Sequence, residues 1–230
     1  MPDEDEQYAL YRAIVSRAEG KPVTIRTLDA GGEKPIPLLH ILFEPNPALG
    51  VRGIRLSLAR PDIFAAQVRA IYRASDDGPL RLLLPMVTTI EELVAARAIV
   101  ADVAAALNAP WVPLGIMVEV PSAALLADEL APLVDFFAIG TNDLTQYTLA
   151  RDRTNALVSD AGTVLHQAVR RLIALVLAAG AAHGRPVSIC GEAASDPETA
   201  ADLIDLGARE LTVAPSAIGG VRAAIRARQL

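Results

Sequence analysis

Short hydrophobic runs recur along the chain and separate longer segments of mixed character. The clear runs cover 23–29, 80–86, 114–120, 136–140, 187–190 and 211–214, and a weaker one covers 50–56. Their residues are apolar almost without interruption, which is typical of parallel strands buried on both faces of a sheet. The pattern therefore predicts a parallel strand at each of these runs.

Amphipathic segments with helical spacing fill the intervals between the runs. Two apolar stripes at this spacing are formed by Tyr11, Ile14, Val15 and Ala18 and, after Pro61, by Phe64, Val68, Ile71, Tyr72 and Ser75. We expect the first helix to stop at Gly20 and Pro22, because neither residue continues a helix well. The longest apolar stretch, 172–182, predicts a further, buried helix.

Three local patterns indicate where other helices begin. Thr89 precedes Glu92 by three positions, which is the spacing of a capping box. Ser122 is a suitable N-cap for the helix after the run 114–120. Asp196 precedes Pro197, a residue favoured at the first position of a helix.

The alternation of strands and helices predicts an α/β fold. Two architectures share this pattern, the closed (β/α)8 TIM-type barrel and the open doubly wound sheet. The chain opens on a helix, as a barrel without its first strand would, so we expect a TIM-type barrel lacking that strand. Periodicity alone leaves the open sheet as an alternative. A length of 230 residues, 52% of them hydrophobic, suits one domain over residues 1–230.

Charge and composition argue against several classes of function. The net charge is −6 and no block of Lys and Arg is present, so we expect no nucleic-acid partner. The stretch 172–182 is too short to span a bilayer and the first residues are acidic, so we expect neither a membrane span nor a signal peptide. A single cysteine, Cys190, excludes an internal disulfide and suits the reducing cytoplasm.

Acidic side chains follow two successive predicted strands. Glu119 ends one run, and Asp143 comes shortly after the next. In a β/α barrel the carboxyl ends of the strands face one shared site, and neighbouring strands lie about 5 Å apart, so both carboxylates can bind one cation. Mg²⁺ commonly takes one or two protein carboxylates together with water and substrate oxygens. Solvated acids, or acids paired with arginines, remain the alternative.

Arginines and the cysteine also lie at or near strand and loop ends. Arg26, Arg52 and Arg153 could bind a small dianion, because guanidinium groups bind phosphate and carboxylate bidentately. An ordinary salt bridge is the alternative for each of them. Cys190 could carry a proton or could be a small buried hydrophobic residue. The three histidines show neither metal-ligand spacing nor a triad context.

Several of these segments together resemble a known family. They are VTIRTLDAGGEK at 23–34, NPALGVRGIR at 46–55, GIMVEVP at 115–121, DFFAIGTNDLTQY at 135–147 and CGE at 190–192. These segments resemble the sequence of the phosphoenolpyruvate-binding C-terminal barrel domain of Enzyme I, the phosphoenolpyruvate-protein phosphotransferase of the sugar phosphotransferase system. The resemblance covers nearly the whole chain in order, and GTNDLTQY is its most specific part.

The resemblance implies a phosphotransferase that moves phosphate from phosphoenolpyruvate to a protein histidine and releases pyruvate. It implies Mg²⁺ bound by Glu119 and Asp143, and a proton at the pyruvate methyl carbon handled by Cys190. The implied substrate-binding residues are Arg26, Lys34, Arg52, Asn142 and Arg153. The implied partners are a phosphohistidine domain, a phosphocarrier protein and a second copy of the chain.

The family's phosphohistidine domain and first barrel strand have no counterpart in the sequence. We therefore expect the chain to be inactive without the histidine domain. One alternative is a non-catalytic module for phosphoenolpyruvate sensing or dimerisation. Others are the barrel of a pyruvate phosphate dikinase or phosphoenolpyruvate synthase relative, and a self-contained Mg²⁺-dependent lyase or aldolase.

Overall fold

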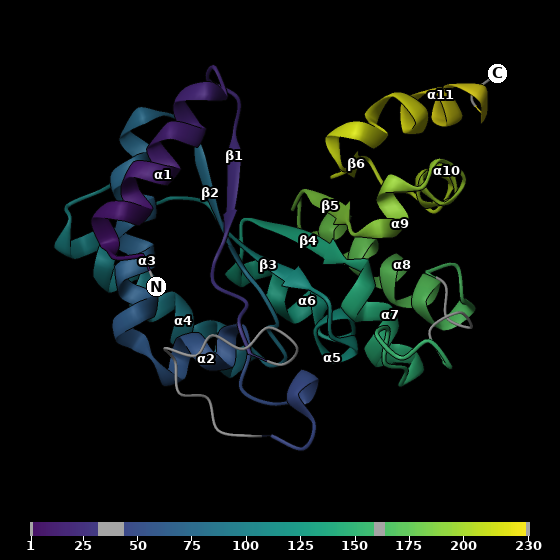
Figure 1. Ribbon diagram of the computed structural model, residues 1–230, viewed down its shortest axis with the longest axis horizontal. Helices are drawn as coiled ribbons and strands as arrows, with labels where there is room; N and C mark the ends of the chain where they lie inside the picture. The colour runs from purple at the N-terminus through teal and green to yellow at the C-terminus, as the bar shows by residue number, and fades with distance from the viewer. Residues whose placement is uncertain (1, 32–43, 159–163, 229–230) are drawn as a thin grey trace. The chain divides into compact units, whose positions relative to one another are not determined.

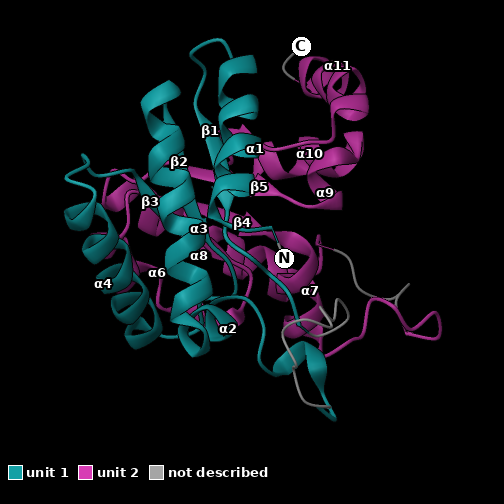
Figure 2. Cartoon of the chain, turned by 60° about the vertical axis from the view of Figure 1, so that its left-hand side comes forward, with its two compact units in different colours: residues 1–116 teal, residues 117–230 magenta. Residues whose placement is uncertain are grey.

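The computed structural model of the protein describes residues 2–31, 44–158 and 164–228. The chain forms two compact units, 1–116 and 117–230 (Figure 2). Both contain parallel strands alternating with helices (Figure 1), so the predicted α/β class is confirmed. None of the described helices is long and apolar enough to cross a membrane.

Unit 1 contains three longer helices and three parallel strands. Its elements are α1 (Glu4–Arg17), β1 (Val23–Arg26), η2 (Pro47–Leu49), α2 (Ile54–Ala59), α3 (Pro61–Ala74), η3 (Ser75–Asp77), β2 (Leu80–Leu84), α4 (Ile90–Ala106) and β3 (Leu114–Val118), which contains the boundary between the units. Strand β1 pairs with β2, and β2 pairs with β3, both in parallel. The continuous apolar runs at 23–29, 80–86 and 114–120 therefore do mark parallel strands.

The weak run at 50–56 is not a strand, which corrects the sequence-based expectation. The chain there leaves η2 and enters the short helix α2. Gly53 takes a φ of +54°, outside the extended region, and a Cβ at this position would lie 2.6 Å from Met86 Cβ. Helix α2 then buries Ile54 and Leu56. A run of apolar residues in the sequence does not distinguish such a short buried helix from a buried strand.

Helix α1 is fixed at its first turn by a capping box. Asp3 Oδ1 accepts the N–H of Glu6 at 2.9 Å, and Glu6 Oε2 accepts the N–H of Asp3 at 2.9 Å. Its predicted apolar stripe is confirmed in part, because Tyr11 and Val15 are buried while Ile14 is 44% exposed. Helices α1 and α3 pack side by side (Figures 1 and 2), and Phe64, Val68, Ile71 and Tyr72 of α3 are almost fully buried, as expected.

A cluster of charges also joins α1 to α3. The Glu4 carboxylate lies 2.6 Å from Arg69 Nε and 2.9 Å from Arg73 Nη1. Arg73 in addition pairs with Asp5 at 2.7 Å and lies over the ring of Tyr8. Partial burial raises the pKa of Glu4, but the hydrogen bonds and charges of Arg69 and Arg73 outweigh it and leave that pKa below its ordinary value.

We expect Glu4→Gln to lower the free energy of unfolding by about 0.5–1 kcal/mol at pH 7, the upper range for exposed ion pairs. A carboxyl group whose pKa is lowered in the folded state stabilises the fold at pH values above its ordinary pKa, which is 4.5 for Glu4. This stabilisation is lost as the pH falls through the lowered pKa. Urea unfolding from pH 7 to pH 3 should therefore show wild type and variant converging below pH 4.5. Glu129→Gln, on an exposed acid, is the control; a constant difference at every pH would contradict the assignment.

Unit 2 contains the other three described strands and the longest helix of its half of the chain. Its elements after β3 are α5 (Pro121–Leu125), α6 (Ala127–Leu130), η4 (Ala131–Leu133), β4 (Phe136–Gly140), α7 (Thr141–Leu149), α8 (Gln167–Ala182), β5 (Val187–Cys190), α9 (Glu192–Ser195), α10 (Pro197–Asp205), β6 (Glu210–Leu211), η6 (Pro215–Ala217) and α11 (Ile218–Arg228). Strand β4 pairs with β5, and β5 with β6, again in parallel. Strands β4 and β5 match their predicted runs at both ends, whereas β6 is shorter and begins one residue earlier than its run.

The helix starts were predicted correctly in two cases and wrongly in one. Thr89 and Glu92 form both bonds of a capping box at the start of α4. Asp196 Oδ1 accepts the N–H of Thr199 at 2.8 Å at the start of α10. Ser122, in contrast, is not an N-cap: α5 already begins at Pro121, and Val120 is the cap residue. Pro at the first helical position determines this start, because its fixed φ suits the helix and it has no N–H to be capped.

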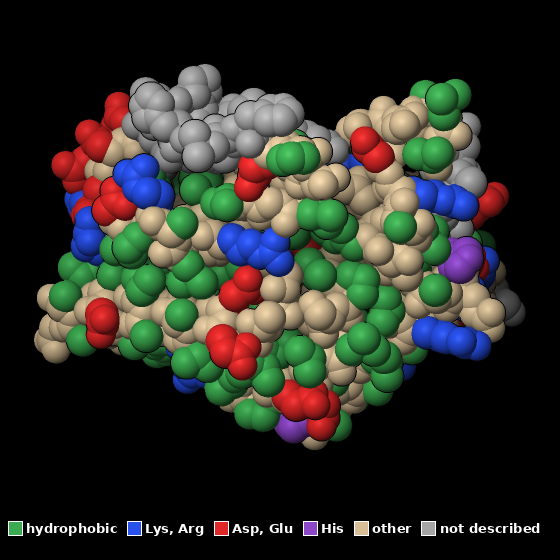
Figure 3. Space-filling view, turned by 90° about the horizontal axis from the view of Figure 1, so that it is seen from below, with side chains coloured by type: hydrophobic (Ala, Val, Ile, Leu, Met, Phe, Trp, Pro, Cys, Tyr) green, Lys and Arg blue, Asp and Glu red, His purple; other side chains and the backbone are tan. Residues whose placement is uncertain are grey.

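Charged side chains of both signs lie among hydrophobic ones over the described surface. On the face in Figure 3, Lys and Arg side chains stand singly or beside Asp and Glu. The ion pairs among the described residues include Arg60 with Asp62 at 2.7 Å and Arg228 with Asp202 at 2.6 Å. Basic side chains on this surface are thus partly neutralised locally, which agrees with the scattered Lys and Arg of the sequence.

Candidate functional site

In unit 1, the two candidate arginines meet at one carboxylate. Arg52 makes a bidentate pair with Asp29, from Nε to Oδ1 at 3.2 Å and from Nη2 to Oδ2 at 2.9 Å. Arg26 Nη1 lies 3.5 Å from Asp29 Oδ2. The Asp29 side chain is 4% exposed, that of Arg52 11% and that of Arg26 39%. Arg52 is therefore largely buried against Asp29, while the Arg26 side chain is partly exposed to solvent.

Asp29 was not among the predicted site residues. The signal was present, because Asp29 lies three residues after Arg26 in the same motif. The pairing with Arg52, 23 positions away, depends on chain folding. Gly31 contributes to it: its φ is +102° and an added Cβ would lie 3.1 Å from Arg52 Cβ, so the absence of a side chain permits this approach. Lys34 lies outside the described residues.

In unit 2, Gly140 brings three candidate residues to the same place. Glu119 follows β3 directly and its carboxylate lies so close to Gly140 that an added Cβ would be 2.8 Å from Glu119 Oε2. Cys190 is the register partner of Gly140 on β5. Asp143 lies three residues after Gly140, in the first turn of α7. The strand-end acids and the thiol thus gather around the end of β4.

Both acids are buried, with Glu119 2% and Asp143 7% exposed. Asp143 lies in the first turn of helix α7. Helix α7 begins directly after β4, so the residues after Gly140 have no loop to occupy. An acid in the first helical turn also interacts favourably with the exposed N–H groups there.

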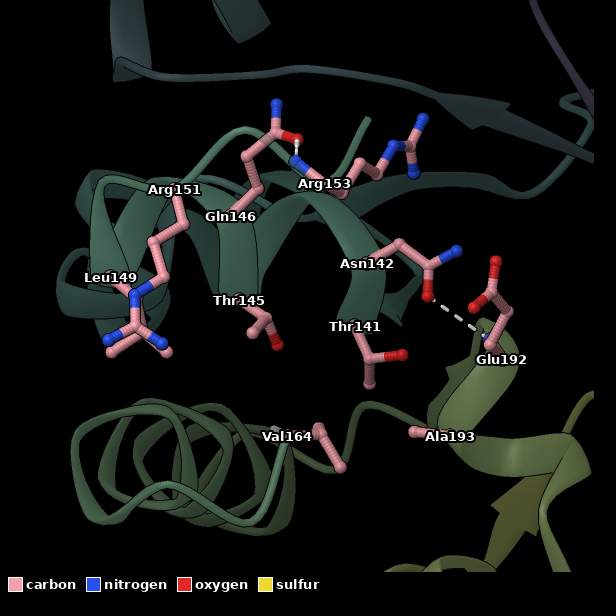
Figure 4. A pocket seen from close by; sticks show the side chains of 10 residues that line it. All are labelled: Thr141, Asn142, Thr145, Gln146, Leu149, Arg151, Arg153, Val164, Glu192 and Ala193. Atoms are coloured by element: carbon pink, nitrogen blue, oxygen red, sulfur yellow. Dashed lines mark hydrogen bonds between the residues drawn. The ribbon is translucent and has the colours of Figure 1, made fainter. Parts of the chain in front are cut away.

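The junction of β5 with α9 is tied to the start of α7. Thr141 Oγ1 donates to the carbonyl of Cys190 at 2.8 Å. Asn142 Oδ1 accepts the N–H of Glu192 at 3.1 Å (Figure 4). Gly191 has a φ of +106°, and a Cβ there would overlap Thr141 Oγ1. A glycine is required here both for its conformation and for the close approach of the two segments.

Cys190 is partly exposed, and its thiol group makes a hydrogen bond. Its Sγ donates to the carbonyl of Ile139 at 3.3 Å, and the residue is partly exposed. It is one of the residues that line an open depression, together with Asn142, Thr212, Val213 and Ala214.

Arg153 lies in a short segment after α7 whose backbone is held by local hydrogen bonds. The Gln146 side-chain oxygen accepts the N–H of Arg153 at 3.0 Å (Figure 4), and Gln146 itself is buried. Asp152 Oδ1 accepts both the hydroxyl and the N–H of Thr154, and these bonds keep the pKa of Asp152 below its ordinary value. Gln146 thus positions a candidate substrate arginine, a role that its place in a helical motif did not reveal.

The residues present fit a hard cation. Glu119 and Asp143 provide carboxylate oxygens in buried positions near the end of β4, which is the donor chemistry that Mg²⁺ prefers. Across the described parts of the chain, no group of three or more His, Cys, Asp and Glu side chains is assembled as a metal site. Two carboxylates match a Mg²⁺ site in which water and substrate oxygens complete the octahedron.

Solved structures define the class of fold. The malate synthase of Haloferax volcanii, in its magnesium/glyoxylate complex, superposes with a TM-score of 0.64 at 14% identity, covering 96% of this chain and 61% of that one. A citrate lyase from Burkholderia xenovorans gives a TM-score of 0.56 at 24% identity, covering 70% and 53%. The chain accordingly has a β/α fold of the TIM-barrel type, as predicted.

Sequence comparison gives the family. The model of the PEP-utilising enzyme PEP-binding domain matches residues 1–230, and the chain belongs to this family. The multiphosphoryl transfer protein of Rhodobacter capsulatus is 50% identical over 225 residues, and the phosphoenolpyruvate-protein phosphotransferase of Priestia megaterium is 43% identical over 232 residues. Each match covers 98% of this chain, but the chain spans only 27% and 40% of the two relatives.

Proposed function

We propose that this chain is the phosphoenolpyruvate-binding part of a phosphotransferase that passes the phosphoryl group to a protein histidine and releases pyruvate. The gathering of Glu119, Asp143 and Cys190 around Gly140, in a chain that matches a PEP-binding domain throughout, carries this proposal. The partners we propose are a phosphohistidine domain, a phosphocarrier protein and a second copy of the chain, all in the cytoplasm.

Phosphoryl transfer from phosphoenolpyruvate requires charge neutralisation and in-line positioning more than covalent help. Arg26 and Arg153 are exposed enough to bind a phosphate or a carboxylate, and Arg52 is fixed in place by Asp29. The amide nitrogen of Asn142 can donate to a substrate, since its side-chain oxygen already accepts the N–H of Glu192. We assign Lys34 to the same group on the family resemblance.

In this proposal, Glu119 and Asp143 hold Mg²⁺, which when bound neutralises negative charge on the substrate oxygens. The residues themselves are suited to the task because both are buried and fixed, Glu119 against the end of β4 and Asp143 in α7. A preformed pair of acids needs little rearrangement when the ligand arrives.

Cys190 is proposed to handle the proton at carbon. Loss of the phosphoryl group leaves enolpyruvate, and formation of a C–H bond at its terminal carbon gives the pyruvate methyl group. The Cys190 S–H bond breaks to supply this proton, and the thiolate recovers one from solvent, which reaches this partly exposed residue. In the reverse direction the thiolate removes a methyl proton from pyruvate.

We expect Arg26→Gln and Arg153→Gln each to weaken phosphoenolpyruvate binding by about 1.5–3 kcal/mol, the range for hydrogen bonds to charged groups. Isothermal titration calorimetry with Mg²⁺ present measures this loss. Arg171→Gln, which removes an exposed arginine on α8, is the matched control and should bind as wild type does.

Losses near zero for both variants would mean that these arginines serve structure only. Arg26 would then be a partner of Asp29 and no more. Equal losses in all three variants, the control included, would show that net charge rather than position governs the affinity.

A further inference from the structure

A series of hydrogen bonds crosses unit 1 and ends beside the candidate arginines. Gln7 Nε2 donates to the carbonyl of Pro2 at 3.1 Å, and the Tyr11 hydroxyl donates to Gln7 Oε1 at 3.2 Å. Gln67 Nε2 donates to the Tyr11 hydroxyl at 3.0 Å, and Gln67 Oε1 accepts the N–H of Leu28 at 2.9 Å. This relay of three side chains joins α1, through the adjacent α3 (Figure 2), to the segment that follows β1.

The direction of every bond in the relay is fixed by its two ends. The Leu28 N–H can only donate and the Pro2 carbonyl can only accept, so a single orientation of the two amides and the Tyr11 hydroxyl satisfies them all. Gln7 is 6% exposed and Tyr11 9%. Burial raises the pKa of Tyr11, which keeps the proton that its hydroxyl donates. Polar groups that are buried with every partner in place rigidify their surroundings.

The relay holds the backbone directly before a residue of the candidate site. Leu28 precedes Asp29, and its side chain also packs against a buried hydrophobic cluster. The Asp29 carboxylate lies 2.9 Å from Arg52 and 3.5 Å from Arg26. Gln67 thus fixes the backbone from which Asp29 projects. A shift of this backbone would move the carboxylate that both arginines contact.

We propose that Gln67 is a positioning residue for the phosphoenolpyruvate site and that Tyr11 fixes its orientation. Gln67 acts on substrate binding indirectly, through the backbone of Leu28 and the carboxylate of Asp29. Helix α1, which carries Tyr11, thereby contributes to the order of the arginines at the end of β1. This inference rests on the proposed function, because it takes Arg26 as a group that binds the substrate.

The test compares Gln67→Met with wild type. Met has nearly the length of Gln but lacks the amide that accepts the Leu28 N–H and donates to Tyr11. In the chain without ligand, exchange of the Leu28 amide hydrogen, followed by NMR, should become about tenfold faster, the change that one hydrogen bond implies. In titration calorimetry with Mg²⁺, the dissociation constant for phosphoenolpyruvate should rise about tenfold or more, because small displacements of positioning groups are costly.

Three further variants separate positioning from stability, which urea unfolding measures for each of them. Gln67→Glu keeps an acceptor for the Leu28 N–H and should restore most of the affinity. Tyr11→Phe keeps that bond but removes the hydroxyl that orients Gln67, so it should lose less affinity than Gln67→Met, and it serves if Gln67→Met fails to fold. Gln167→Met, which removes an exposed amide on α8, should behave as wild type does.

Three results would overturn the proposal. One is exchange of the Leu28 amide at the wild-type rate in Gln67→Met. Another is lower stability of Gln67→Met with unchanged affinity for phosphoenolpyruvate, which would make the relay structural only. The third is wild-type exchange and affinity in Tyr11→Phe, which would show that α1 does not orient Gln67. A wild-type chain that binds no phosphoenolpyruvate would instead contradict the proposed function, whereas the exchange measurement contains no ligand and reports on the relay alone.

Discussion

Replacing Cys190 by Ser is expected to slow exchange of the pyruvate methyl protons with solvent deuterium by about 10²–10⁴-fold, the usual contribution of a general acid or base. The thiol lies beside Gly140, where Glu119 and Asp143 gather, and it is partly exposed. No other thiol exists in the chain. One-dimensional proton NMR of pyruvate in deuterium oxide, with the chain and Mg²⁺ present, measures the exchange rate.

The control for this experiment is binding. Ser retains the size of the side chain and a donor for the Ile139 carbonyl, so phosphoenolpyruvate affinity should not change. Cys190→Ala should be as slow as Cys190→Ser, because both lack the thiol. Exchange at the wild-type rate in both variants would show that Cys190 does not carry the proton and only packs beside Ile139.

Asp143→Asn is expected to lower Mg²⁺-dependent affinity for phosphoenolpyruvate by more than about 100-fold. Outer-shell changes at metal sites already cost about 10–100-fold, so loss of a ligand charge should exceed that range. Titration calorimetry at several Mg²⁺ concentrations should show that affinity depends on the metal in wild type and not in the variant.

The burial of Asp143 decides the choice of substitution. Because the residue lies in the first turn of α7 and is 7% exposed, removal of the whole side chain would leave a void and disturb the helix start. Asn keeps the shape. Asp128→Asn, on an exposed acid that pairs with His183, is the control for loss of one negative charge. Unchanged metal dependence in Asp143→Asn would remove this residue from the proposed site.

The sequence by itself determined most of the fold class. Buried parallel strands must be apolar on both faces. For this reason the apolar runs predicted the first and last residues of β4 and β5 correctly. Caps also depend on neighbours in sequence, and for this reason Thr89 with Glu92 and Asp196 could be recognised as helix starts. The same reasoning failed at 50–56, where a glycine with positive φ and burial against Met86 selected a short helix.

The candidate site residues were predicted by type, but their relations were decided by tertiary structure. Asp29 holds Arg52 across 23 positions, Gly140 receives the Glu119 carboxylate, and Gln146 holds the backbone of Arg153. Such contacts depend on the distance between segments after folding, which no local pattern contains.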